Sequence, residues 1–267
     1  MRTPAALTTP MTTATTTTNS IHTRVTTAFI SDLHLDGSRP AATAAFLQWL
    51  RGPALELDRL YILGDLFEYW IGDDDPDPHH REVREALRDY TRQMPRVWFI
   101  AGNRDFQIGP DFALETGMQL LPDPSLIEVG GTSVLIGHGD LLCTDDISYQ
   151  RFRRFARHPL VLKFYRAMPF FIRRMLVDEA RSRSHKLKLD KTPDIMDVNQ
   201  DAVEANLRRY RVQTLLHGHT HRPAEHEFTV DGRAATRIVL GDWYRNGPVM
   251  YWDDDGRRVE TLSFPDS

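Results

Sequence analysis

The sequence predicts an α/β fold, in which buried strands alternate with amphipathic helices. Short apolar runs rich in β-branched and aromatic residues are separated by segments with helical periodicity. Several of these runs end in a glycine that is followed by Asp, Asn or His. Ligands of open α/β sheets bind beyond the carboxyl ends of the strands, so these polar side chains lie where a site is expected.

A chain of 267 residues can bury a sizeable core, either as one large domain or as one domain with an insertion. Its apolar runs fall well short of the roughly 18 residues that a transmembrane helix needs. The single cysteine, Cys143, excludes an internal disulfide and suits a reducing cytoplasm. We expect Cys143 to be a small semi-buried residue and not a nucleophile.

The net charge of −4 conceals an uneven distribution. Residues 151–191 contain 13 Lys and Arg against 3 Asp and Glu, so this block carries +10 and the remainder −14. A basic block on an acidic body indicates an anionic partner, such as phosphates, nucleic acid or an anionic membrane surface.

The chain divides into a tail, a main domain and an insertion. Residues 1–24 are Thr-rich and lack the apolar segment of a signal peptide, so we expect a disordered tail, with Met11 as an alternative start. The ordered domain is expected over 25–267, with a basic, aromatic-rich helical insertion at 150–192.

The first expected strand, 26–30, leads into Ser31-Asp32-Leu33-His34. The second, 60–63, ends at Gly64 and presents Asp65. Further strands are expected at 96–100, 132–136, 212–216 and 237–240, and helices at 41–50, 79–94, 112–116 and 198–210.

Polar donors therefore follow five strands, and each is an oxygen or imidazole donor: Asp32 and His34, Asp65, Asn103, His138, and His219 and His221. Taken singly, these residues have ordinary interpretations as turn, loop or core residues. Their coincidence at five strand ends indicates a site for Mn²⁺, Mg²⁺, Fe or Zn²⁺. Seven donors are too many for one ion that must also bind water and substrate, so we predict two ions bridged by Asp65.

The spacing within two of the clusters supports this interpretation. Asp32-x-His34 and His219-x-His221 each place two side chains on one side of an extended segment. His217 shares that parity, but Gly218 intervenes, so we treat it as a neighbour and not a ligand. Two ions about 3.5–4 Å apart can clamp a phosphoryl group and activate a bridging water.

In this order, the motifs Asp32-x-His34, Gly64-Asp65, Gly102-Asn103, Gly137-His138 and Gly218-His219-x-His221 resemble those of the calcineurin-like metallophosphoesterase superfamily. The resemblance implies a four-layer α/β/β/α sandwich with a dinuclear site at the strand ends. It assigns one ion to Asp32, His34, Asp65 and His221, and the other to Asp65, Asn103, His138 and His219.

Within that superfamily, Arg104 stands where most members have a His. Four segments, 69–75, 102–106, 142–146 and 195–200, resemble the UDP-2,3-diacylglucosamine pyrophosphohydrolases of lipid A biosynthesis, and the resemblance extends from about 27 to 265. It implies Mn²⁺-dependent hydrolysis at the α-phosphorus, giving UMP and 2,3-diacylglucosamine 1-phosphate. It also implies an enzyme on the cytoplasmic face of the bacterial inner membrane.

The implied catalytic residues are Asp65, Asn103, Arg104 and His138. The implied substrate contacts are Asn103, Arg104, Asp146, Ser184, Lys188, Lys191 and His219. Lys188 departs from the family pattern, where an Asn is expected. Because a departing phosphate needs no proton donor, a guanidinium that binds phosphate oxygens suits a diphosphate substrate. Alternatively, Arg104 only pairs with a neighbouring carboxylate.

The insertion is expected to be helical, with Pro159 and Pro169 at helix starts. Phe171 and Met175, with Ile172 and Leu176, form an apolar stripe, and Arg173, Arg174 and Arg181 lie to other sides. One interpretation is a lid whose apolar face holds acyl chains and whose basic rim meets phosphates or a membrane. The other is a subdomain that packs its own aromatics beneath solvated arginines.

Three rival functions remain open at this point. Nucleic acid would suit the charge of the insertion, but its stripe is more apolar than a phosphate track requires, so no nucleic-acid partner is expected. Another dinuclear phosphoesterase could act on nucleotides, nucleic acid or phosphoproteins. A non-catalytic scaffold on the same fold should have lost metal ligands, whereas all seven are present here.

Overall fold

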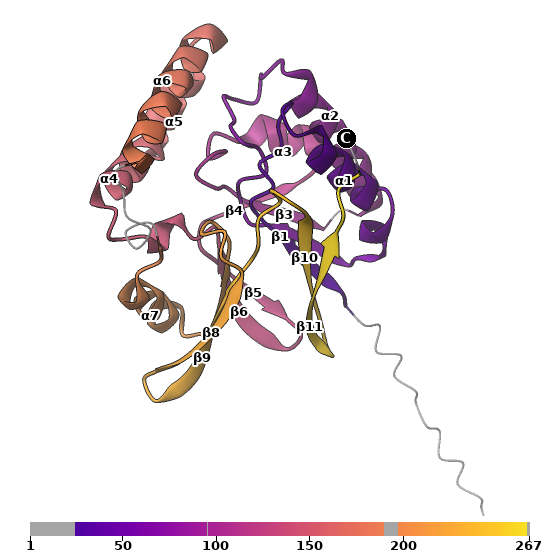
Figure 1. Ribbon diagram of the computed structural model, residues 1–267, viewed down its shortest axis with the longest axis vertical. Helices are drawn as coiled ribbons and strands as arrows, with labels where there is room; N and C mark the ends of the chain where they lie inside the picture. Colours follow the sequence, from indigo (N-terminus) through magenta and orange to yellow (C-terminus); the bar gives the residue numbers. More distant parts are fainter. Residues whose placement is uncertain (1–24, 95, 190–196, 266–267) are drawn as a thin grey trace, which may run out of the picture.

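The computed structural model describes residues 25–94, 96–189 and 197–265, and for 183–189 it describes the backbone alone. The expected tail, 1–24, lies outside the described residues. The described chain forms two β-sheets with helices on their outer faces, as Figure 1 shows.

The first sheet has six strands in the order β11-β10-β1-β2-β3-β4. Its strands are β1 (Thr27–Ile30), β2 (Arg59–Ile62), β3 (Val97–Ile100), β4 (Gln119–Leu121), β10 (Gly247–Asp253) and β11 (Gly256–Leu262). Strands β1 to β4 are parallel, whereas β10 runs antiparallel to both β1 and β11. The carboxyl ends of β1, β2 and β3 therefore lie at one edge of the sheet.

The second sheet has five strands in the order β5-β6-β7-β9-β8. Its strands are β5 (Ser125–Val129), β6 (Thr132–Gly137), β7 (Thr214–His217), β8 (Ala224–Val230) and β9 (Arg233–Val239). The three central strands β6, β7 and β9 are parallel, and β5 and β8 are antiparallel edge strands. This sheet also brings the carboxyl ends of its parallel strands to a single edge.

Three layers of apolar contact hold the molecule together. On β1, alternate side chains point to opposite faces, so Ala28 and Ile30 pack toward the helices and Phe29 packs toward the second sheet. On the second sheet, Leu135 and Leu215 face the outer helix α7 (Gln200–Tyr210). Strands covered on both faces are apolar almost throughout, which explains their continuous hydrophobic runs.

The helices α1 (Pro40–Leu50), α2 (Pro78–Gln93) and α3 (Pro110–Thr116) cover the first sheet. The four-layer α/β/β/α prediction is therefore confirmed. The expected helices at 41–50, 79–94, 112–116 and 198–210 match α1, α2, α3 and α7 to within a few residues.

Five strands were not predicted from the sequence: β4, β5, β8, β10 and β11. Strands β8 and β11 are almost entirely exposed, so hydrogen bonding to a neighbour stabilises them and no apolar run marks them. Strand β4 has only three residues. Strand β10 does carry buried residues, but it begins with Gly247-Pro248, a pair typical of turns.

The insertion forms three helices, α4 (Ile147–Ala156), α5 (Pro159–Arg166) and α6 (Phe170–Leu189), which lie together at one side of the sandwich (Figure 1). Pro159 is the first residue of α5 and Pro169 immediately precedes α6, as predicted. Bulky apolar side chains of these three helices are exposed: Ile147, Phe152, Phe155, Leu160, Phe164, Phe171, Ile172, Met175 and Leu176.

Not all of the basic side chains of the insertion form a solvated rim. Arg173 is only 2% exposed, its Nη1 donates to the Ile71 carbonyl at 3.2 Å, and its Nη2 pairs with Asp74. Tyr165 also donates to the Ile71 carbonyl, at 2.9 Å. These contacts attach α5 and α6 to the loop that follows β2. Arg173 therefore holds the insertion against the core and does not belong to an exposed basic rim.

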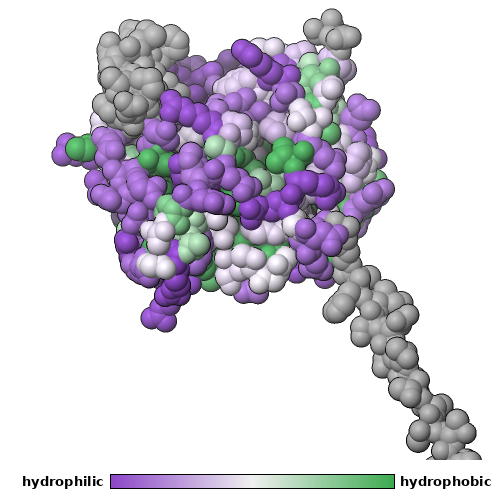
Figure 2. Space-filling view, turned by 60° about the horizontal axis from the view of Figure 1, so that its bottom comes forward, coloured by the Kyte–Doolittle hydropathy of each residue, from purple (hydrophilic) through white to green (hydrophobic). Residues whose placement is uncertain are grey.

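The face drawn in Figure 2 is largely hydrophilic, with apolar side chains in small separate groups. Within the described ranges, none of the helices has both the length and the apolar character needed to cross a bilayer.

Candidate metal centre

Loops that follow strands of both sheets are joined by backbone hydrogen bonds at the carboxyl edge. The Asp32 amide donates to the Gly64 carbonyl at 3.0 Å, which joins the loops after β1 and β2. The Gly218 amide donates to the His138 carbonyl at 2.8 Å, which joins the loops after β6 and β7. The expected polar clusters are thereby held beside one another.

The backbone of these loops is unusual. Seven non-glycine residues of the described chain have positive φ, and five of them are predicted ligands: Asp32 (55°), His34 (49°), Asp65 (52°), His219 (70°) and His221 (55°). A left-handed conformation costs such residues of order 1–3 kcal/mol each, and strain of this kind gathers at functional sites. The chain therefore leaves its strands sharply at the positions that supply the donors.

Glycines permit the close approach of the two neighbouring strand ends. A Cβ atom on Gly102 would lie 2.1 Å from Asp65 Oδ1, and one on Gly64 would lie 2.6 Å from Gly102 Cα. Gly64 also has a φ of +86°, which favours glycine. The Gly-Asp and Gly-Asn pairs of the sequence are therefore steric requirements of this site.

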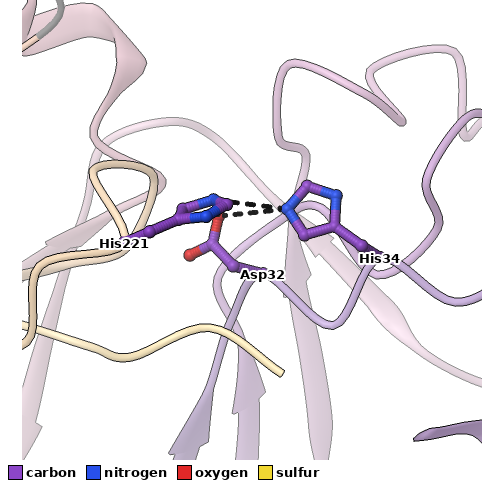
Figure 3. A group of neighbouring side chains, drawn as sticks. All are labelled: Asp32, His34 and His221. Atoms are coloured by element: carbon purple, nitrogen blue, oxygen red, sulfur yellow. Dashed lines mark hydrogen bonds and ion pairs between the residues drawn. The ribbon is translucent and has the colours of Figure 1, made fainter. Parts of the chain in front are cut away.

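One group of donors comprises Asp32, His34 and His221, drawn in Figure 3. His221 Nε2 lies 3.3 Å from Asp32 Oδ1 and 3.3 Å from His34 Nε2. Asp65 Oδ2 approaches the same cluster, at 3.8 Å from His34 Nε2. This is the set that the family resemblance assigned to one ion.

A second group comprises Asp32, Asp65 and His138. His138 Nε2 lies 3.6 Å from Asp65 Oδ1 and 3.0 Å from Asn103 Oδ1. Asp65 thus contributes one oxygen to each side of the centre, which is the arrangement expected of a bridging carboxylate. Asp32 also belongs to both groups, a sharing that was not predicted.

His219 is half-buried beside these groups without joining either of them. Its ring lies edge-on to the His138 ring at a centroid distance of 5.0 Å, and its amide donates to Asp32 Oδ2 at 2.8 Å. Burial and the neighbouring His138 lower the pKa of His219 to about 3. The ring is therefore neutral, as a metal-ligating imidazole must be.

Two of the imidazoles are oriented by partners on their far side. His34 Nδ1 lies 2.9 Å from Glu68 Oε2, and His138 Nδ1 donates to the Leu63 carbonyl at 2.9 Å. Each contact directs the Nε2 atom into the centre. A second partner of this kind is typical of metal-binding histidines.

Asp105 anchors the loops beneath the donors. Its carboxylate accepts hydrogen bonds from the amides of Gly102 at 2.8 Å and Leu66 at 2.7 Å. Burial and the nearby Asp65 raise the pKa of Asp105 to about 7. This buried carboxylate holds the loops after β2 and β3 together without facing the donor groups.

The electrostatics of the centre favour a cation. Burial lowers the pKa of His138, but Asp65 and Asp32 outweigh it and raise that pKa to about 9. Asp32 Oδ1 is buried without a well-formed hydrogen bond. The buried carboxylates of Asp32 and Asp65 therefore lie among imidazoles, where a divalent ion would neutralise them, and the oxygen and nitrogen donors fit such ions.

Arg104 lies at the rim of the centre. Its amide donates to Asp65 Oδ1 at 2.8 Å, and its Nη1 lies 3.4 Å from Glu68 Oε1. The pairing with a neighbouring carboxylate that the sequence analysis left open is therefore present. Because a quarter of the Arg104 side chain is exposed, it also remains accessible to a ligand.

The other predicted substrate contacts are placed less completely. Asp146 caps α4, since its Oδ1 accepts from the Tyr149 amide at 3.0 Å. Ser184 and Lys188 fall on α6, where the structure describes the backbone alone, and Lys191 lies outside the described residues. Contact between these three side chains and a substrate stays a prediction.

Several residues that support the centre were not predicted from the sequence. Glu68 and Asp105 orient donors, and Asp242 Oδ2 lies 3.6 Å from His221 Nδ1. Asp242 follows β9 in a Gly-Asp pair, so the signal used for Asp65 was present there too. Glu68 carried no local signal, because its role depends on a contact with a distant strand end.

His217 and Cys143, which were not predicted to be a ligand or a nucleophile, are both buried. His217 is buried outside both donor groups, and its Nε2 accepts from Arg237 at 3.4 Å. Cys143 is buried, and burial together with Asp140 raises the pKa of its thiol to about 12, which is unsuited to a nucleophile.

Comparison with known proteins agrees with this geometry. The model of the calcineurin-like phosphoesterase family matches residues 25–223. UDP-2,3-diacylglucosamine hydrolase of Salmonella arizonae is 48% identical over 239 residues, covering 90% of this chain and 99% of the relative. The protein of that name from Serratia proteamaculans is 47% identical with the same coverage.

Among solved structures, an archaeal phosphodiesterase overlaps with a TM-score of 0.46 at 12% identity, covering 89% of this chain and 100% of that one. The family match extends over most of the chain and includes every predicted metal ligand. The chain belongs to the calcineurin-like phosphoesterase family.

Proposed function

We propose that this protein hydrolyses the diphosphate of UDP-2,3-diacylglucosamine by attack of water on the α-phosphorus, releasing UMP and 2,3-diacylglucosamine 1-phosphate for lipid A biosynthesis. The proposal is supported by the names of relatives that share almost half of the sequence over nearly all of their length. The observation that carries it is the convergence of Asp32, His34, Asp65, His138 and His221 on one edge of two sheets.

The cofactors would be two divalent ions, with Mn²⁺ as the proposed metal. One ion would be held by Asp32, His34, Asp65 and His221, and the other by Asp65, Asn103, His138 and His219. Bound ions of this kind lower the pKa of a water and withdraw charge from a phosphoryl group. The donor set, oxygen and imidazole without thiolate, supports a hard or borderline metal.

The side chains of the centre would have distinct tasks. Asp65 would bridge the two metal positions, because its two oxygens face different donor groups. Asn103 and His138, whose side chains meet at 3.0 Å, would hold the second position and orient a phosphate oxygen. Arg104 would leave its pairing with Glu68 and bind phosphate oxygens with its guanidinium fork.

No general acid is needed for this leaving group. The bond that breaks joins the α-phosphorus to the bridging oxygen, and the electron pair departs on a sugar phosphate. That phosphate is a stable anion, so a fixed cation that shares its charge is more useful than a proton donor. The Arg in place of the superfamily's His is thus suited to a diphosphate.

Helices α4, α5 and α6 would act as a lid over the acyl chains. Their exposed side chains include Phe155, Phe164, Phe171 and Met175, each more than half exposed. A two-tailed lipid offers an apolar ligand for this surface. The net positive charge of the insertion would attract anionic headgroups, so we propose peripheral binding at the cytoplasmic face of the bacterial inner membrane.

The deciding experiment measures UMP release from UDP-2,3-diacylglucosamine in detergent micelles with Mn²⁺, with EDTA, and with Asp65→Ala. We expect Mn²⁺-dependent release that EDTA abolishes and that falls by at least about 100-fold in the variant. Absence of UMP release by a folded, metal-loaded wild-type protein would overturn the substrate assignment. If this protein still hydrolyses a generic phosphodiester, the metal centre stands and the substrate is a different one.

A further inference from the structure

Arg157, at the C-terminal end of α4, contacts several segments that surround the candidate metal centre. Its Nη2 donates to the Gly102 carbonyl at 2.9 Å and lies 3.3 Å from Asp140 Oδ2. Its Nη1 donates to the Ala101 carbonyl at 3.3 Å, and the guanidinium lies 5.5 Å from the centre of the Phe106 ring. A single side chain thus joins the insertion to several parts of the core.

These contacts connect the two sheets at the strand ends that carry ligands. Ala101 and Gly102 follow β3 of the first sheet and immediately precede Asn103. Asp140 follows β6 of the second sheet and lies two residues after His138. Arg157 therefore fixes the loop that carries Asn103 against the loop that carries His138.

A second arginine of α4 reinforces the same arrangement. Arg153 Nε lies 2.9 Å from Asp140 Oδ2, and its Nη2 lies 2.6 Å from Asp123 Oδ2. Asp123 Oδ1 in turn accepts from the His138 amide at 3.2 Å. Asp140 is fully buried, so its charge depends on the arginines that face it.

The geometry requires a guanidinium. Two carbonyls and one carboxylate surround the Arg157 side chain, which is 18% exposed. A planar fork can donate to all three at once, whereas the ammonium of lysine is a point charge on a flexible stem. Arg157 bonds to backbone carbonyls and to Asp140, and within the described chain it forms no hydrogen bond or ion pair with a predicted ligand side chain.

We propose that Arg157 is a positioning residue that holds Asn103 and His138 in register, so that binding of the second metal ion depends on the docking of α4. This inference rests on the proposed metal centre and is independent of the identity of the substrate. In this proposal the insertion both covers the substrate site and holds the loops that carry two metal ligands. Partners of this indirect kind change metal affinity or activity by about 10–100-fold when removed.

The test compares Arg157→Gln with Arg154→Gln. Arg154 lies on the same helix, is exposed, and makes no ion pair or hydrogen bond within the ranges that the structure describes. Mn²⁺ binding is measured by equilibrium dialysis and calorimetry, and folding by circular dichroism. We expect Arg157→Gln to bind one ion with wild-type affinity and the other at least about tenfold more weakly. Arg154→Gln should bind both ions as the wild type does.

Hydrolysis of a soluble phosphodiester gives a second measurement. For Arg157→Gln, activity should be lost at limiting Mn²⁺ and recovered at saturating Mn²⁺, with KM for the phosphodiester unchanged. A purely structural role would lower the melting temperature without a selective loss of one ion. If Arg157→Gln does not fold, Arg157→Lys is measured instead, and it should show the same selective loss to a smaller degree.

Wild-type affinity for both ions in a folded Arg157 variant would overturn the proposal. Equal weakening of both ions would overturn it as well, since only Asn103 and His138 lie on the loops that Arg157 holds. Because this test measures metal binding, it can be carried out even if the wild type does not release UMP. In that case the substrate assignment fails, and the proposal for Arg157 can still be tested.

Discussion

At the scale of single residues, the centre is built from side chains whose conformations are set by their neighbours. Asp65 directs its two oxygens toward different donor groups, and its backbone adopts a left-handed conformation to do so. Glu68 contacts two residues of the site, since one of its carboxylate oxygens faces His34 and the other faces Arg104. The ligand and the proposed phosphate-binding arginine are thereby linked through one carboxylate.

The first prediction concerns Arg104. Replacing it by His should lower turnover of UDP-2,3-diacylglucosamine by about 100-fold, the cost of removing one group that stabilises transition-state charge. The measurement is steady-state UMP release at saturating Mn²⁺. Hydrolysis of a monoanionic phosphodiester with a phenolate leaving group should change only a few-fold, because that group carries no phosphate. Unchanged turnover of the diphosphate would contradict the assigned role.

At the scale of elements, the basic and the aromatic residues of the insertion lie in different environments, although they are interspersed along its sequence. Some of its basic residues are internal: Arg153 and Arg157 face Asp140, and Arg173 is buried against the loop after β2. Its aromatic residues, in contrast, are largely exposed. The docked arginines were not expected, and the exposed aromatics differ from the interpretation in which the insertion packs its own aromatics. The role of the insertion as a lid stays a prediction.

The second prediction belongs to helix α6. Phe171→Ser should raise KM for the diacyl substrate in micelles about tenfold or more, because burying a Phe side chain contributes roughly 1.5–3 kcal/mol. The kcat for a soluble phosphodiester should stay unchanged. The matched control is Leu114→Ser on α3, a side chain outside the insertion that is 85% exposed. Equal effects of the two substitutions on KM would contradict the proposal that the insertion binds the acyl chains as a lid.

Binding to membranes is measured with the same pair of variants. Sedimentation with vesicles that contain an anionic phospholipid should recover less Phe171→Ser protein than wild type, and Leu114→Ser should behave as the wild type. Loss of binding at high salt would indicate that the basic residues contribute as well.

At the scale of the whole molecule, metal binding should stabilise the fold, because the donors come from distant parts of the chain that meet only in the native state. Saturation at about 100 times Kd contributes roughly 2.7 kcal/mol for one site. For a domain of this size, that corresponds to a rise in Tm of about 5–10 °C.

The measurement is the Tm by calorimetry with and without Mn²⁺. Asp65→Asn should abolish the metal-dependent rise, since Asp65 contributes to both donor groups. The control is Asp254→Asn, in the exposed turn between β10 and β11, which should retain the rise. A full rise in the Asp65 variant would show that the ion stabilises the protein from another site.

The fold class and the chemical identity of the donors could be predicted from the sequence alone. Asp32, Asp65, Asn103, His138 and His219 each follow a strand, and a strand with its terminal turn is a local feature that hydrophobic periodicity and glycine placement reveal. Because parallel strands present their carboxyl ends at one edge, convergence of these donors could be predicted before any contact was known.

The orientation of the donors and the burial of individual charges could not be predicted, because they depend on contacts between distant parts of the chain. The contacts of His34 with Glu68, of His138 with the Leu63 carbonyl, and of Arg157 with Asp140 join residues far apart in the chain or on different elements. Exposed edge strands such as β8 and β11 were missed for the same reason, since pairing with a neighbour defines them. Periodicity records which face of an element is buried, but not which partner covers it.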